Sequence, residues 1–321
     1  MRSINKFPIK PVARILLVIV LLVIADSGIG SLMRKFYFKQ ESGDTYLLTY
    51  AIDSTEADIL ILGSSRAKHS YVPSIFQENL NMSCFNAGRD GTEHILFNNA
   101  QFTSITTRYS PKIIIFDIRP EDLIYNANEY DMLSPLMPYY KTHREIRYLI
   151  NIRSPFERLK HLSAIYPYNS LIFQIIMGNL EMNKDRKPHE NGYIPFLGSK
   201  LTNTLDTLQT PVYPIDTYKT DIIKDMIISC KEKEICLVLI YSPTYNIVMD
   251  NYYQRILNEI CEENDIEYLN FSNVHEILMN PDFFFDRTHL NDDGARKFSG
   301  LVSARLKDFL NCNEQILTKY E

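Results

Sequence analysis

Two short stretches, far apart in the chain, hold side chains that could perform acyl-transfer chemistry together. The stretch "DILILGSS" places Gly63, Ser64 and Ser65 directly after an apolar run, and "FFFDRTHLNDDG" places Asp286 three residues before His289. A serine hydroxyl becomes nucleophilic at neutral pH when a base takes its proton, and a histidine base needs a carboxylate to orient it. One loop that carries Asp286 and His289 could supply both groups to a serine from another element.

The intervening sequence predicts the elements that would bring these motifs together. Short apolar runs at 58–63, 84–88, 112–118, 234–243 and 266–272 read as strands, and the stretches at 92–110, 218–233 and 251–264 have helical periodicity. Strands separated by helices predict an α/β fold with a parallel sheet covered on both faces. Ligands of such sheets bind at the carboxyl ends of the strands, where the serine pair lies. A serine pair after a strand is also a common turn or helix cap.

These motifs resemble those of the SGNH, or GDSL-type, hydrolase family. The Gly-Asp-Ser motif of that family is similar to the run 63–65, which implies that Ser65 is the nucleophile and that Ser64 stands in the Asp position. The Asp-x-x-His motif of the family matches Asp286 and His289, which implies that they are the orienting carboxylate and the base. The resemblance further implies a flavodoxin-like three-layer α/β/α sandwich.

A second family motif, a glycine after a short second strand, is similar to "FNAGRDGTEH". Gly91 is the better counterpart of that glycine and Gly88 is the alternative. The resemblance implies that the backbone N–H groups of Gly91 and Ser65 form the oxyanion hole. Two other histidines, His69 and His94, lie close to these motifs in sequence but lack the Asp-x-x-His context.

A third family motif, Gly-x-Asn-Asp, has no match in this chain. The equivalent stretch is "IIIFDIRPEDL", in which Pro120 stands where the family has the asparagine that donates to the oxyanion. Arg119 or Asn126 could replace this donor, or the backbone donors could act alone. Membrane-anchored relatives that transfer acyl groups on cell-surface polymers also diverge at this motif, so the resemblance favours that branch.

The N-terminus has the pattern of an export segment. An apolar run of about 11 residues, 15–25, follows four basic residues: Arg2, Lys6, Lys10 and Arg14. The run alone is short of the roughly 20 residues that span a bilayer, and a weakly polar extension to Leu32 brings it to about 18. We expect a single-pass anchor in the cytoplasmic membrane with the catalytic domain in the periplasm. The alternatives are secretion after cleavage near Ala25, or a buried helix of a cytosolic protein.

The predicted organisation has four successive parts, one of which contains an insertion. Residues 1–36 form the anchor or signal, 37–56 a linker, 57–312 the SGNH-like domain, and 313–321 a tail. Within the domain, 125–217 is a helical insertion, expected beside the active-site mouth because a loop after the third strand emerges at the catalytic edge.

Composition excludes several classes of function. The 321 residues carry a net charge of −5 without a basic run in the body of the chain, so no nucleic acid is expected as a partner. The seven histidines and five cysteines lack metal-site spacing, and no glycine-rich phosphate loop follows the first strand, so neither a metal nor an organic cofactor is expected.

The sequence therefore predicts an extracytoplasmic serine esterase or O-acyltransferase. Its expected substrate is an acylated carbohydrate, with O-acetyl as the expected group, and its expected partners are the membrane and a membrane protein that exports acyl groups. The alternative is a catalytically poor SGNH-like subunit that binds glycan or assists acyl transfer.

Overall fold

The computed structural model describes residues 9–91, 95–182, 190–201, 204–208, 211–249 and 251–312. Its centre is a parallel sheet with the strand order β2-β1-β3-β5-β7. The strands are β1 (Ile59–Leu62), β2 (Cys84–Asn86), β3 (Ile113–Asp117), β5 (Cys236–Tyr241) and β7 (Glu267–Asn270). The order is that of a flavodoxin-like sheet: β2 is added on one side of β1, and the later strands are added on the other side, beginning with β3. The predicted α/β class is confirmed.

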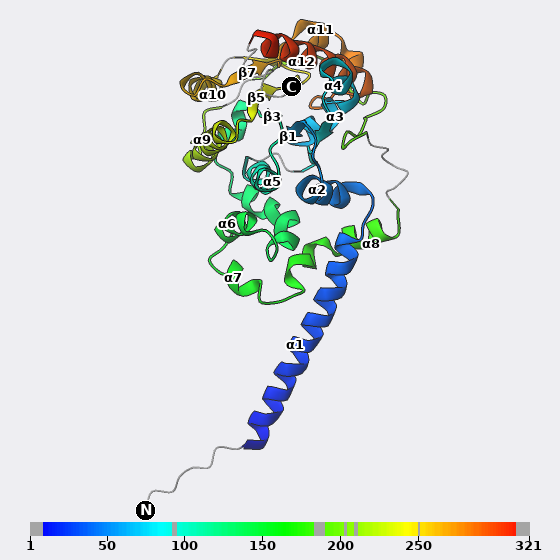
Figure 1. Cartoon of the computed structure of the whole chain (residues 1–321), viewed down its shortest axis with the longest axis vertical. Helices are drawn as coiled ribbons and strands as arrows, with labels where there is room; N and C mark the ends of the chain where they lie inside the picture. The colour runs from blue at the N-terminus through cyan, green and yellow to red at the C-terminus, as the bar shows by residue number, and fades with distance from the viewer. Residues whose placement is uncertain are drawn as a thin grey trace, which may run out of the picture.

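Alternating strand residues divide the interior into two cores. In β1, Leu60 and Leu62 belong to one core and Ile59 and Ile61 to the other, and all four are fully buried. The first core is covered by α2 (Gly43–Asp53), α5 (Ile95–Arg108), α9 (Thr217–Glu232) and α10 (Tyr252–Glu263), and the second by α3 (Ser65–Ser70), α4 (Pro73–Leu80), α11 (His275–Leu278) and α12 (Asp292–Cys312). Figure 1 shows these helices on the two sides of the sheet, which makes a three-layer sandwich.

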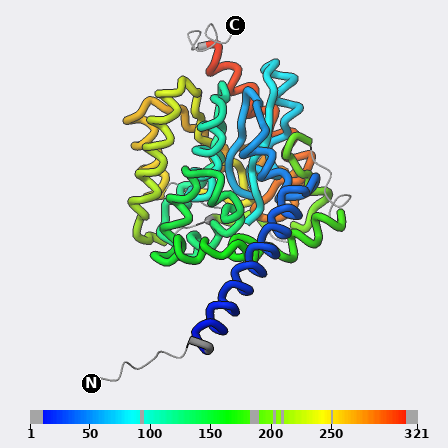
Figure 2. Tube along the Cα trace, turned by 60° about the horizontal axis from the view of Figure 1, so that its bottom comes forward, coloured from blue at the N-terminus to red at the C-terminus, as the bar shows by residue number. Residues whose placement is uncertain are grey.

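The segment between β3 and β5 adds a further layer to the first face. It contains η1 (Pro120–Leu123), η2 (Ala127–Tyr139), α6 (Arg144–Ile152), α7 (Glu157–Lys160), η3 (Tyr166–Leu171) and α8 (Ile172–Asn179). Ile146, Leu149 and Ile150 lie on one side of α6 and are buried in the core that α5 shares. The helices α6 to α8 therefore lie beyond α5 and around one end of α1 (Figure 2). Of the predicted insertion 125–217, these helices are not beside the expected active-site mouth, whereas the later segment around Phe196 contacts His289.

Small elements complete the described chain. The strands β4 (Thr207–Leu208) and β6 (Ile247–Val248) form a separate two-stranded parallel sheet, and η4 (Pro281–Phe283) precedes the Asp-x-x-His loop.

Helix α1 (Ile9–Phe38) is long and apolar enough to cross a membrane by length and composition. Its most apolar 18-residue window has a mean hydropathy of 2.5 and is 6% buried. The helix projects from the domain in Figure 1. An anchor and a signal sequence both fit this helix.

The linker predicted for 37–56 is wrong, because most of it is helix α2. Leu47, Leu48, Ala51 and Ile52 have helical spacing and are buried in the first core, which fixes this helix on α5. The tail predicted for 313–321 lies outside the described residues.

Candidate active site

A sharp turn between β1 and α3 positions the serine pair. Gly63 has φ +149°, and a Cβ added there would lie 2.7 Å from Ala67 Cβ and 3.0 Å from Asp117 Cβ, so only glycine fits. Ser64 is the N-cap of α3, and its side chain accepts a hydrogen bond of 3.3 Å from the N–H of Arg66. The two serines therefore have different positions: Ser64 caps the helix, and Ser65 begins it.

The structure brings Ser65, His289 and Asp286 into one chain of hydrogen bonds. The Oγ of Ser65 lies 2.8 Å from Nε2 of His289. The Nδ1 of His289 lies 3.0 Å and 3.1 Å from the two carboxylate oxygens of Asp286. This arrangement leaves Nε2 facing the serine hydroxyl and Nδ1 facing the carboxylate, as a Ser-His-Asp triad requires.

The carboxylate of Asp286 is stabilised in its charged form. Burial alone would raise the pKa of Asp286, but the N–H of Thr288 and the side chain of His289 donate hydrogen bonds that together hold this pKa below its usual value. The backbone N–H groups of Thr288 and His289 lie 2.8 Å and 2.9 Å from Oδ1. Asp286 is therefore ionised at neutral pH and can stabilise an imidazolium.

The loop that carries Asp286 and His289 is closed at both ends. An antiparallel bridge joins Phe284 to Leu290, and the N–H of Phe285 donates to the carbonyl of His289 at 2.9 Å. Asn291 then fixes the start of α12, because its Oδ1 accepts from the N–H of Gly294 at 3.0 Å while its Nδ2 donates to the carbonyl of Asp282. Asp286 and His289 thus project from a short hairpin with little freedom to move.

Among the predicted oxyanion donors, the backbone of Gly88 is occupied. Its N–H donates to Oδ1 of Asn86 at 2.9 Å, and an added Cβ would lie 2.5 Å from the nitrogen of Lys68. Gly91 has φ +68° and open space around the position of a Cβ. Gly91 therefore stays the candidate that accompanies Ser65, and the alternative Gly88 is not supported.

The two side chains considered as a third oxyanion donor hold local turns. Nε and Nη2 of Arg119 donate to Oδ1 of Asp122 at 3.1 Å and 2.9 Å. Asn126 caps η2, and its Oδ1 accepts from the N–H of Asn128 at 3.0 Å. Neither arrangement supports the prediction that one of these side chains replaces the missing oxyanion donor. The other histidine considered in the sequence, His94, lies outside the described residues.

A stack of aromatic rings lies beside Ser65 and His289, and no sequence pattern predicts it. Phe196 stacks on His69 with ring centroids 3.8 Å apart and on Phe285 at 4.3 Å, and it meets the ring of His289 edge-on at 5.4 Å. Both nitrogens of His69 are engaged, Nδ1 with the carbonyl of Ile194 at 2.6 Å and Nε2 with the carboxylate of Asp90 at 2.9 Å. His69 therefore holds the segment around Phe196 against His289. Because both of its ring nitrogens are occupied, His69 is not a base for Ser65.

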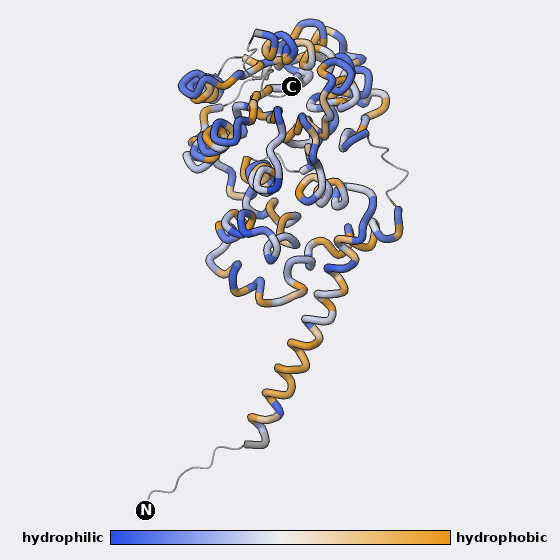
Figure 3. Tube along the Cα trace, viewed as in Figure 1, coloured by the Kyte–Doolittle hydropathy of each residue, from blue (hydrophilic) through white to orange (hydrophobic). Residues whose placement is uncertain are grey.

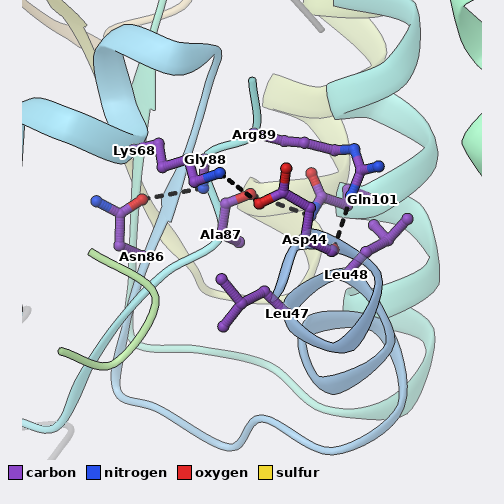
Figure 4. Close-up of a pocket in the computed structure, with 9 residues that line it drawn as sticks. All are labelled: Asp44, Leu47, Leu48, Lys68, Asn86, Ala87, Gly88, Arg89 and Gln101. Carbon is purple, nitrogen blue, oxygen red and sulfur yellow. Dashed lines mark hydrogen bonds and ion pairs between the residues drawn. The ribbon is translucent and has the colours of Figure 1, made fainter. Parts of the chain in front are cut away.

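Charged residues connect α2 to this neighbourhood. The ammonium group of Lys68 is buried and donates to Asp44 at 2.6 Å and to Asp90 at 3.0 Å. Nη1 of Arg89 donates to the backbone carbonyl of Asp44 at 2.8 Å. Figure 4 shows Asp44 between Lys68 and Arg89, at a pocket of about 10 Å³ that has room for no more than a water molecule. This pocket is too small to bind a substrate.

No group of three His, Cys, Asp or Glu side chains in the described part of the chain lies close enough to hold a metal ion.

Comparisons with known proteins give distant structural likenesses only, to eleven chains of solved structures. No protein family and no curated protein matches the sequence. A solved structure from Desulfitobacterium hafniense DCB-2, assigned to the G-D-S-L family of lipolytic proteins, is similar over 77% of this chain and 98% of its own, with 10% identity and a TM-score of 0.36. A likeness at this level does not assign a function, which must be inferred from the geometry of the side chains.

Proposed function

We propose that this protein is a membrane-anchored serine esterase or O-acyltransferase of the SGNH type that acts on acyl esters of a cell-surface glycan. The observation that carries the proposal is the continuous hydrogen-bonded chain from Ser65 Oγ through His289 to Asp286, with distances of 2.8 Å and 3.0 Å. These are the distances at which a histidine can take a proton from a serine hydroxyl.

The reaction follows from this geometry in two steps. As Ser65 Oγ attacks the acyl carbonyl carbon, Nε2 of His289 takes the hydroxyl proton, and the backbone N–H groups of Ser65 and Gly91 hold the developing oxyanion. His289 then returns that proton to the leaving alkoxide, which departs as an alcohol and leaves an acyl-serine. In the second step His289 takes a proton from the acceptor as the acceptor oxygen attacks the acyl carbon. The bond between that carbon and Ser65 Oγ then breaks, and His289 returns the proton to Oγ, which restores the free serine. Water as acceptor gives an esterase and a sugar hydroxyl gives a transferase.

The cellular setting is proposed from the N-terminal segment. The basic residues before the apolar run 15–25 would keep the N-terminus in the cytoplasm and place the domain in the periplasm. The glycan ester and a membrane partner that exports acyl groups are proposed because the missing Gly-x-Asn-Asp motif resembles the divergence seen in membrane-anchored members of the SGNH family.

Covalent labelling of the full chain tests the assignment of the nucleophile. The purified protein in detergent is incubated with a fluorophosphonate, and the adduct is measured by intact mass. We expect labelling of the parent and of Ser64→Ala, because Ser64 only caps α3, and loss of labelling in Ser65→Ala. His289→Ala should label far more slowly, since the base is lost. Thermal melting of each variant controls for folding.

The opposite labelling pattern would move the nucleophile to Ser64. A folded parent that neither forms an adduct nor hydrolyses any acyl ester would refute the enzymatic proposal and favour the accessory binding subunit. Adding an oligosaccharide acceptor to the assay then separates the two reactions, because a transferase makes an acylated sugar at the expense of free acid.

A further inference from the structure

The base of the domain, where α1 enters it, is apolar and exposed. Six large apolar side chains around α7 and on or next to α8 are between 49% and 75% exposed, and we call them the basal patch: Phe156, Leu159, Leu162, Phe173, Ile176 and Leu180. Figure 1 shows α7 and α8 on either side of α1 at this end of the domain. An exposed apolar surface of this kind marks an interaction site.

Helix α1 is fixed to this base over several turns. The carboxylate of Asp26 accepts hydrogen bonds of 2.6 Å from Ser163 Oγ and from the N–H of Ala164. Ten residues further along, the carbonyl of Phe36 accepts from Nδ2 of Asn179 at 2.9 Å. At 1.5 Å per residue, these contacts hold about 15 Å of helix against the domain. The helix and the basal patch therefore move as one body.

The apolar part of α1 that is free of the domain is too short to cross a bilayer. The apolar run 15–25 ends just before Asp26 and is about 16 Å long, roughly half of a 30 Å hydrocarbon core. On α1 beside the domain, Ile29 and Leu32 are still 51% and 53% exposed. Counting to Leu32 extends the apolar length to about 27 Å, which matches the membrane. Figure 3 shows the apolar colour along the projecting part of the helix.

A span that reaches Leu32 takes the base of the domain into the lipid. Leu32 lies six residues, or about 9 Å, beyond the level at which Asp26 binds the 163–165 loop, next to Leu162. That depth is in the range of 5–10 Å at which apolar faces of interfacial helices lie in the lipid. The carboxylate of Asp26 tolerates this position because both of its oxygens accept hydrogen bonds from the loop.

We propose that the basal patch is inserted into the outer interface of the same bilayer that α1 spans, so that the domain is seated on the membrane in one orientation. This inference rests on the membrane anchoring proposed above. The partner is the lipid surface itself: the apolar side chains enter the acyl boundary, and the exposed Arg158 beside them is placed to meet phosphate headgroups.

The seating determines how a substrate would reach the site. In Figure 1 the layers of the domain are stacked in the direction of α1, with α12 at the far end, then the sheet, then α5 and α6. The carboxyl edge of the sheet, where β1 leads into Ser65, therefore opens sideways, along the membrane surface. A seated domain would take its ester from the layer next to the lipid.

Tryptophan fluorescence tests the seating, because the chain contains no tryptophan. The full chain carrying Phe173→Trp or Leu162→Trp is reconstituted into phosphatidylcholine–phosphatidylglycerol vesicles. The matched control is Tyr252→Trp, a 44% exposed position at the start of α10, far from α1 in Figure 1. We expect blue-shifted emission and quenching by brominated lipid at both patch positions, and quenching by aqueous iodide at the control position.

Three outcomes would overturn the proposal in distinguishable ways. Quenching of both patch tryptophans by iodide, in protein that resists extraction by alkaline carbonate, leaves the anchor intact and places the base in water. Blue-shifted patch tryptophans that brominated lipid does not quench mean that protein, such as a second copy of the chain, covers the patch. Release of the chain by carbonate removes the anchor and the seating together, while Ser65 labelling still tests the chemistry independently.

Discussion

A buried ion pair next to Ser65, the proposed nucleophile, allows a specific prediction about stability. Nη2 of Arg66, the residue after Ser65, lies 2.9 Å from Oδ1 of Asp117, and the two side chains are 2% and 0% exposed. Nη1 of Arg66 also donates to Ser242 Oγ at 3.2 Å. The substitution Arg66→Met keeps most of the side-chain volume and removes the charge. We predict that it leaves the buried carboxylate of Asp117 without its cationic partner.

The size of the effect follows from this burial. Removing one partner of a buried ion pair costs about 3–5 kcal/mol, which is roughly 6–20 °C in Tm for a domain of this size. Burial already raises the pKa of Asp117 although Arg66 opposes the shift. In the variant Asp117 should take up a proton on folding, so the stabilisation by that proton is present at low pH and lost as pH rises through the raised pKa. The deficit relative to the parent should therefore shrink as pH falls from 7 towards 5.

Thermal melts of the full chain in detergent, at several pH values, measure this effect. The matched control is Arg296→Met, which removes an ion pair of the same 2.9 Å length whose side chains, Arg296 and Asp292, are 47% and 27% exposed. That variant should lose at most about 1 kcal/mol, without the same pH dependence. Adding Asp117→Asn to Arg66→Met should recover part of the loss. If Arg66→Met loses no more Tm than Arg296→Met at every pH, then burial does not raise the cost of losing this ion pair.

Two further predictions concern the surroundings of the site. Arg119→Ala should leave turnover of a small acetyl ester within a few-fold of the parent, because its guanidinium is bound to Asp122; a loss on the order of 100-fold in kcat would show instead that it holds the oxyanion. Burial opposes the charge of Asp44, but Lys68 and Arg89 hold the pKa of Asp44 below the usual 3.8. The charged carboxylate therefore stabilises the fold above pH 3.8, and this stabilisation is lost as the pH falls through the lowered pKa. Thermal melts should show Asp44→Asn to be less stable than the parent at neutral pH and to approach it in acid; an unchanged difference would contradict this account.

The parts of the fold that the sequence predicted depend on local patterns. The run 59–62 is apolar at every position, which is typical of a strand buried on both faces, and the sheet places it between β2 and β3. Asp286 and His289 are three residues apart, so a single hairpin brings their side chains together whatever surrounds it. The meeting of His289 with Ser65 followed from the resemblance to a family and from the rule that ligands bind at the carboxyl ends of parallel strands.

The parts that the sequence did not predict depend on contacts between distant residues. His69 and Ile194 are 125 positions apart, and nothing near Phe196 in the sequence indicates that its ring contacts two histidines. The apolar side of α6 shows that this helix must pack against another element, but no local pattern shows that this element is α5. Helix α2 is a different case, because its apolar residues have a helical spacing that the sequence itself shows, although the stretch as a whole is polar.

The correction at α2 changes how the anchor and the candidate site are related. Asp44 follows the end of α1 by six residues, yet its carboxylate binds Lys68 in the helix that begins with Ser65. Its backbone carbonyl accepts from Arg89, in the loop that leads to Gly91. A chain that began at Ala57 would therefore lose one of the two carboxylate partners of the buried Lys68 ammonium, in the helix that begins with Ser65, along with a support of the proposed oxyanion loop. Helix α2, between α1 and β1, is thus part of the framework of the candidate site. In the proposed membrane-anchored state, the orientation of α1 would be carried through Asp44 to the elements that hold Ser65.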